Sequence, residues 1–146
     1  VDEDAHQIED TARTYGLDYI QLHGNESPAQ CKELQASGLQ LIKVFSVANS
    51  FDFEVLKPYE EWVDFFLFDT KGKLPGGNGY TFDWEQMSNY PSEVPFFLSG
   101  GIGPEHRAVV KQLDLPKLYA LDVNSKFEIR PGFKDVAKLK EFWLDQ

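Results

Sequence analysis

The run Asp64-Phe65-Phe66-Leu67-Phe68, followed by Asp69, decides the fold class of this 146-residue chain. Its apolar residues are consecutive and do not alternate with polar ones, which is the pattern of a strand buried on both faces of a parallel sheet. Similar runs recur with centres about 23–30 residues apart, close to the length of a strand–helix–strand unit. The five expected strands are 18–22, 40–45, 64–68, 95–98 and 117–121.

Helical patterns lie between these strands and before the first one. Gly16 is placed to end the first helix, and Ser27-Pro28 reads as an N-cap followed by proline at the first helical position. The expected helices are 5–15, 28–37, a stretch from 50 or 52 limited by Pro58, 83–87, 104–113 and 135–144. The residues expected to face inward are Ile8, Ala12, Tyr15, Cys31, Leu34, Val109, Val110, Leu113, Val136, Leu139 and Trp143. Alternating strands and helices predict an α/β fold with a parallel sheet.

Composition excludes several classes of protein. The length fits one domain, 1–146. The 24 acidic and 14 basic residues give a net charge of −10, which argues against nucleic acid and anionic membrane surfaces as partners. No apolar run reaches the ~20 residues that span a bilayer, and no signal peptide is visible. A single cysteine excludes an internal disulfide and fits the cytoplasm.

Two candidate site residues directly follow strands, where parallel α/β folds place their ligands. Asp69 is a possible general acid, because loss of water contact raises a carboxyl pKa. It could equally cap a loop or pair with Lys71. His23 could contact a substrate. It could also hold its loop through a backbone hydrogen bond.

The loops after the last two strands form a candidate anion site. Gly100 and Gly101 expose backbone N–H groups ahead of a helix, which suits a phosphate, although a double glycine is also an ordinary tight turn. The segment Asp122-Val123-Asn124-Ser125 adds a carboxylate, a hydroxyl and further donors, or is simply a polar loop. In barrels this pair of loops frequently binds phosphate.

The remaining reactive side chains are interpreted as structural. Cys31 falls inside a helical pattern and is expected to be a small buried hydrophobe. His6 and His106 are expected to be exposed on helices, and 2–4 is expected to be a solvated helix start. No cluster has metal-ligand spacing, so no metal site is expected.

Taken in order, these motifs resemble the phosphoribosylanthranilate isomerase family. The stretch 17–27 (LDYIQLHGNES) is similar to the family's QLHG-(D/N)-E motif, and 68–84 contains its DT-K, GG-x-G and FDW elements. Ser99-Gly100-Gly101-Ile102 is similar to the family's GGL loop. The segment 122–135, with Glu128, matches its DVSS…E…PG-KD ending.

The resemblance implies a (βα)8 barrel enzyme of tryptophan biosynthesis. It would convert N-(5-phosphoribosyl)anthranilate to 1-(2-carboxyphenylamino)-1-deoxyribulose 5-phosphate by an Amadori rearrangement, without a cofactor. Asp69 would be the general acid. Phosphate would be held by Gly100, Gly101, Asn124 and Ser125, with Asp122 on a ribose hydroxyl and His23 lining the site.

The chain departs from the family pattern in two respects. Lys126 stands where glycine is usual, and Asn124 where serine is usual. A barrel also needs about 200 residues or more. The chain is therefore expected to hold units four to eight and the helix of unit three, without the first-strand cysteine that is the family's base. Isomerase activity is thus expected of a longer parent and not of this polypeptide alone, whose five strands leave two open edges.

Two other functions compete with this interpretation. One is a phosphate-binding module without chemistry, and the other is a different barrel enzyme acting on a phosphorylated sugar. The sequence does not specify the oligomeric state.

Overall fold

The computed structural model describes residues 1–47, 50–70 and 84–144, which form an α/β fold around one parallel sheet. The sheet has the order β1-β2-β3-β4-β5, and every pair of neighbours is parallel. Its strands are β1 (Tyr19–Leu22), β2 (Gln40–Val47), β3 (Phe65–Thr70), β4 (Phe96–Ser99) and β5 (Leu118–Leu121). Five parallel strands at the expected places confirm the α/β prediction.

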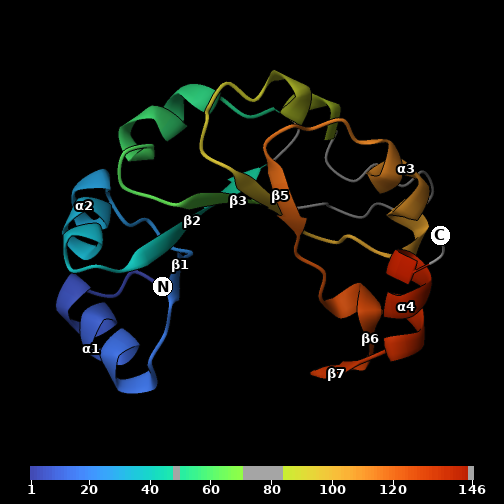
Figure 1. Cartoon of the computed structure of the whole chain (residues 1–146), viewed down its shortest axis with the longest axis horizontal. Helices are drawn as coiled ribbons and strands as arrows, with labels where there is room; N and C mark the ends of the chain where they lie inside the picture. The colour runs from blue at the N-terminus through green and yellow to red at the C-terminus, as the bar shows by residue number, and fades with distance from the viewer. Residues whose placement is uncertain (48–49, 71–83, 145–146) are drawn as a thin grey trace.

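Helices connect the strands and follow the outer side of the curved sheet (Figure 1). The α-helices are α1 (Ala5–Tyr15), α2 (Pro28–Ala36), α3 (Arg107–Gln112) and α4 (Val136–Leu144). Short 3-10 helices are η1 (Phe53–Tyr59), η2 (Trp84–Asn89), η3 (Pro104–His106) and η4 (Ser125–Phe127). The η1 segment contains Pro58, the residue expected to limit an α-helix there.

The expected helix ends at Gly16 and Ser27 are confirmed. Gly16 adopts a left-handed conformation with φ 61°, which glycine reaches without strain, and its N–H donates to the Ala12 carbonyl. The Ser27 side chain accepts from the Gln30 N–H, and Pro28 occupies the first turn of α2.

A small antiparallel hairpin, β6 (Glu128–Arg130) and β7 (Phe133–Lys134), was not expected. Pro131-Gly132 forms its turn, with Gly132 at φ 76°. A Pro-Gly pair is a turn signal, so the hairpin was visible in the sequence in principle. Its strands are too short for an alternating pattern.

The core lies between the sheet and its helices. Phe66, Phe68 and Leu98 are fully buried on this face, together with Cys31 and Leu34 of α2. Tight, mostly edge-on ring contacts such as Phe68–Phe96, with centroids 5.5 Å apart, complete the packing.

The opposite face of the sheet is concave. The rings of Tyr19 on β1 and Phe65 on β3 meet at 5.9 Å although β2 runs between their strands. Phe65 likewise meets Tyr119 on β5 at 4.7 Å across β4. Strands two apart in a flat sheet are about 9.6 Å apart. The convergence of these rings therefore shows that the sheet curls.

The expectation that the strands are buried on both faces is wrong for the two edge strands. Tyr19 is 43% exposed and Tyr119 is 64% exposed. Both point to the concave face, which nothing covers within the described part of the chain. Helices protect only the convex face.

Several helix-face predictions are also wrong. Tyr15, Val109, Val136 and Trp143 are largely exposed, whereas Phe142 is buried against Phe127. In the last two helices the residues that face the core differ from those predicted. The segment 104–113 is divided into η3 and α3, and α4 turns a different side inward. Within the described ranges, none of the helices has both the length and the apolar character needed to cross a membrane.

Candidate active site at the carboxyl ends of the strands

The carboxyl ends of three neighbouring strands surround a cavity of about 190 Å³. It is lined by Asp69, Ser99, Gly100, Gly101, Ile102, Asp122, Asn124, Ser125 and Lys126. These residues come from the end of β3 and from the loops after β4 and β5. The cavity thus brings together the carboxylate and both candidate anion-binding loops that the sequence singled out.

Asp69 belongs to β3 and points to the concave face. It pairs in register with Ser46 on one side and Ser99 on the other, and its side chain is 25% exposed. Because side chains alternate along a strand, Asp69 faces opposite to Phe68, which is buried in the core. The strand therefore holds the carboxyl group at the mouth of the cavity, and the buried side chain of Phe68 anchors the strand there.

The glycine loop after β4 has backbone geometry that favours glycine. Gly100 and Gly101 have φ values of 94° and 69°, which a residue with a side chain rarely adopts. At its far end, the Gly103 N–H donates to Nδ1 of His106 at 2.9 Å. His106 is mostly buried against Trp84 and not exposed as expected, because its ring closes this loop.

The loop after β5 is tied to its surroundings at two points. The Ser99 hydroxyl donates to Oδ2 of Asp122 at 3.0 Å, which joins the loops after β4 and β5. Lys134 of the hairpin donates to Oδ1 of Asn124 and to Oε1 of Glu128. The bond from Lys134 holds the pKa of the Glu128 carboxyl below its usual range. Lys134 thus orients Asn124 from outside the cavity.

His23 follows β1 and lies on the other side of Asp69 from the two loops. Its Nε2 is 3.8 Å from Oδ2 of Asp69, and its Nδ1 is 3.5 Å from Nε2 of Gln21. The ring does not line the cavity itself. Asp69 therefore lies between the imidazole and the loops after β4 and β5.

A second network lies behind His23 and was not predicted. Lys43, in the middle of β2, forms an ion pair with Glu26 at 2.9 Å, and both side chains are at most 3% exposed. The sequence signal was a lysine inside an otherwise apolar strand, since lysine is almost never fully buried unless paired. Asp2 also joins this network by accepting from the Asn25 N–H at 2.6 Å, so 2–4 is not simply a solvated helix start.

The other candidate residues from the sequence lie away from the cavity or outside the described residues. Cys31 is fully buried in α2, as predicted, and burial raises its pKa to about 11. His6 is exposed, as predicted. Lys71, 76–79 and 82–83 lie outside the described residues. In the parts that are described, no group of three His, Cys, Asp or Glu side chains is arranged to hold a metal ion.

The cavity joins a carboxyl group to hydroxyl and backbone donors in loops of the kind that bind phosphate, and comparison with known proteins gives the family. A family model described as N-(5'phosphoribosyl)anthranilate (PRA) isomerase matches residues 1–144. The chain belongs to the PRA isomerase family. A PRA isomerase of Parabacteroides distasonis is 51% identical over 131 residues, which are 90% of this chain and 59% of that protein.

Solved structures of the PRA isomerase family have the same fold. The crystal structure of phosphoribosyl anthranilate isomerase from Thermotoga maritima superposes with a TM-score of 0.77 at 36% identity, over 97% of this chain and 67% of that one. A second PRA isomerase structure, in complex with reduced 1-(o-carboxyphenylamino)-1-deoxyribulose 5-phosphate, has a TM-score of 0.71 at 30% identity over 97% of this chain and 65% of that one. The chain thus spans about 59–67% of these relatives.

Proposed function

We propose that this chain is part of a PRA isomerase, which converts N-(5-phosphoribosyl)anthranilate to 1-(2-carboxyphenylamino)-1-deoxyribulose 5-phosphate in tryptophan biosynthesis. The observation that carries the proposal is that Asp69 lines the same cavity as Gly100, Gly101 and the 122–126 loop. A proton donor beside an anion site suits a sugar whose reactive carbon and phosphate lie a few bonds apart. Family membership supplies the identity of that sugar.

Asp69 is the general acid in this proposal. It donates a proton to the furanose ring oxygen as the bond from that oxygen to C1 breaks, and the anthranilate nitrogen lone pair forms the C1=N bond of a Schiff base. A base then removes the proton from C2, and the C2–H electrons form an enolamine that tautomerises to the ketone. Each proton transfer is typically worth about 10²–10⁴-fold in rate.

The loops hold the other end of the substrate. Gly100 and Gly101 present backbone N–H groups to the phosphate, and Asn124 and Ser125 contribute side-chain and backbone donors. Asp122, whose carboxylate already accepts from Ser99, takes a ribose hydroxyl. The relative solved with a reduced product analogue supports a phosphorylated sugar–anthranilate as the ligand class.

The chain corresponds in this proposal to one domain, 1–146, forming units four to eight of a (βα)8 barrel and the helix of unit three. The curled sheet, its exposed concave rings and its two uncovered edge strands support this assignment. The family's first-strand cysteine, the base, has no counterpart among these residues, because Cys31 is buried in a helix. The 146-residue polypeptide by itself therefore has negligible isomerase activity.

Turnover of the aminosugar phosphate by the protein as naturally expressed tests the proposal. Asp69→Asn lowers kcat by about 10²–10⁴-fold and changes KM little, because amide and carboxyl have the same shape. The isolated 146-residue polypeptide shows no turnover. Turnover by the polypeptide near that of intact family members would contradict the claim that it lacks the general base. Full activity of Asp69→Asn would exclude Asp69 as the general acid.

The competing functions give different results. A phosphate-binding module without chemistry binds the product analogue and shows no turnover before any substitution. Another phosphosugar barrel enzyme turns over a phosphorylated sugar that lacks the anthranilate group. The proposed enzyme needs no cofactor and acts in the cytoplasm.

A further inference from the structure

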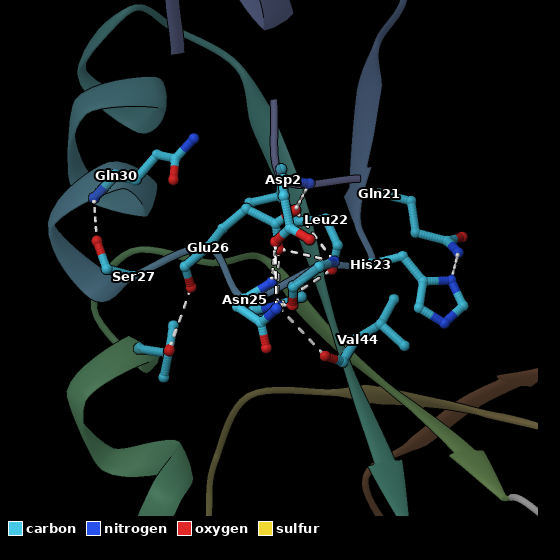
Figure 2. A network of polar contacts seen from close by, with 12 residues as sticks. Asp2, Gln21, Leu22, His23, Asn25, Glu26, Ser27, Gln30 and Val44 are labelled. Carbon is cyan, nitrogen blue, oxygen red and sulfur yellow. Dashed lines mark hydrogen bonds and ion pairs between the residues drawn. The ribbon is translucent and has the colours of Figure 1, made fainter. Parts of the chain in front are cut away.

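The side chain of Lys43 is buried on the convex face of the sheet, away from the cavity. It pairs in register with the fully buried Phe66, so its side chain lies on the same face. Its ammonium group donates to Oε2 of Glu26 at 2.9 Å and to the Gly24 carbonyl at 2.8 Å, with longer contacts of 3.4 Å to the carbonyls of Leu22 and Val44. Figure 2 shows the polar contacts around Asp2 and Asn25 on one side of the loop that follows β1 and the imidazole of His23 turned away from them.

Glu26 completes the pair from the loop side. Both of its carboxylate oxygens accept from the Gly24 N–H at 3.0 Å, and Oε1 also accepts from the Asp2 N–H at 3.3 Å. Burial by itself would raise the pKa of Glu26. The hydrogen bond and charge of Lys43 and the backbone N–H groups outweigh burial and hold this pKa below its usual range. The carboxylate is therefore ionised at neutral pH.

Together the two side chains hold the backbone on both sides of His23. The Leu22 carbonyl belongs to the peptide group before His23, and the Gly24 N–H belongs to the one after it. With both peptide groups bonded to one ion pair, the backbone of His23 has little freedom to rotate. Because side chains alternate, a buried Leu22 directs His23 to the concave face, where its Nε2 lies 3.8 Å from Asp69.

A buried ion pair is weak evidence for a stabilising role. Taking two charges out of water costs several kcal/mol per ion, and replacing such pairs by neutral residues is often neutral or stabilising. We infer that Lys43 and Glu26 are positioning residues that hold His23 against Asp69. This inference rests on the proposed function, in which Asp69 is the acid.

The test compares stability and activity in the protein as naturally expressed. Glu26→Gln with Lys43→Met removes both charges together, so that neither is left buried and unpaired. We expect this double variant to keep its unfolding midpoint within about 5 °C. Its kcat falls by about 10–100-fold, because a displacement of about 1 Å in a site, caused by substitutions away from the chemistry, can cost that much.

A double-mutant cycle with His23→Ala shows whether the loss of kcat depends on His23. In the His23→Ala background, the Glu26→Gln and Lys43→Met substitutions lower kcat by less than about twofold, because the group they position is gone. Asp64→Asn is the matched control. Asp64 likewise accepts from a backbone N–H, that of Leu41 at 2.7 Å, but at the opposite end of the sheet, and this variant keeps its kcat.

Three outcomes separate the possibilities. Unchanged kcat in the double variant, or equal losses with and without His23, overturns the positioning role while leaving the proposed function intact. If the unsubstituted protein has no isomerase activity, the proposed function fails. A crystal structure of the double variant then decides the inference: an imidazole still within about 4 Å of Asp69 overturns it, and a displaced ring supports it.

Discussion

Nε2 of His23 lies 3.8 Å from Oδ2 of Asp69, although β2 separates β3, which carries Asp69, from β1, which His23 follows. The two side chains meet because the sheet curls and both point to its concave face. The same curvature brings Tyr19 to 5.9 Å from Phe65 lower on the same strands. Asp69 thereby contacts an imidazole on one side and lines the cavity formed with the loops after β4 and β5 on the other.

Gly24→Ala is expected to lower both stability and activity. A Cβ at Gly24 would lie 2.4 Å from Oδ1 of Asp2, and 2.7 Å from both the Asp2 backbone nitrogen and Oε1 of Glu26. Backbone at that distance must move, at a cost of about 1–3 kcal/mol in the free energy of unfolding. Urea unfolding and steady-state kinetics measure the two effects.

Gly16→Ala is the control for Gly24→Ala. A Cβ there meets nothing within 4 Å, but φ is +61°, so the cost of about 1–2 kcal/mol is conformational strain alone. We expect this variant to lose stability and keep kcat. If Gly24→Ala behaves in the same way, the loop after β1 does not need its tight packing for activity.

Lys126→Met is expected to weaken binding of a phosphorylated ligand. Among the described residues that line the cavity, Asp69 and Asp122 can carry negative charge, whereas Lys126 carries a positive one. Because Lys126 is exposed, its effect is modest, and KM rises about two- to fivefold with kcat unchanged. The salt dependence of KM should also become weaker, since the lost attraction is screened by salt.

Lys140→Met provides the same change of charge on the exposed side of α4. It should leave both KM and its salt dependence as they are. An equal rise of KM in both variants would assign the effect of Lys126 to net charge and not to its place at the cavity.

Stability is expected to fall at acid pH through Glu26. Its folded pKa lies below the ordinary value, so the unfolded state binds the proton more readily. The stabilisation is therefore complete above the ordinary pKa of about 4.3 and is lost as the pH falls through the lowered folded value. Unfolding free energies from urea titrations between about pH 6 and about pH 3 measure this slope.

The variant with Glu26→Gln and Lys43→Met should show a shallower acid slope, because the group that titrates is gone. Glu128→Gln removes a second glutamate whose pKa is lowered, through Lys134, and serves for comparison. An unchanged slope in the double variant would mean that Glu26 does not contribute to acid unfolding.

The thiol of Cys31 is expected to be unreactive in the native protein. It has no exposed surface, and burial raises its pKa to about 11, so almost no thiolate is present at neutral pH. A thiol reagent at about pH 8 should label Cys31 only after unfolding in urea. Cys31→Ala should cost about 1–2 kcal/mol of stability and leave kcat intact. Rapid native labelling, or loss of kcat, would contradict a purely structural role.

The local features of this protein were predictable from sequence because they depend on neighbouring residues. Consecutive apolar runs predicted the five strands of the parallel sheet, and Gly16 and Ser27 marked helix ends through their own backbone and side-chain chemistry. Since the carboxyl ends of parallel strands share one edge, the sequence also indicated that Asp69 and the two anion-binding loops lie together.

Only the tertiary structure decided which faces are covered and which distant groups meet. The exposure of Tyr119 results from the curvature of the sheet, and that of Trp143 results from the docking of the last helix. No local sequence pattern encodes either. The ion pair of Lys43 and Glu26 joins a strand to a loop 17 residues earlier. Such a contact depends on the register of β1 against β2 and on burial, which arise only when the whole sheet has formed.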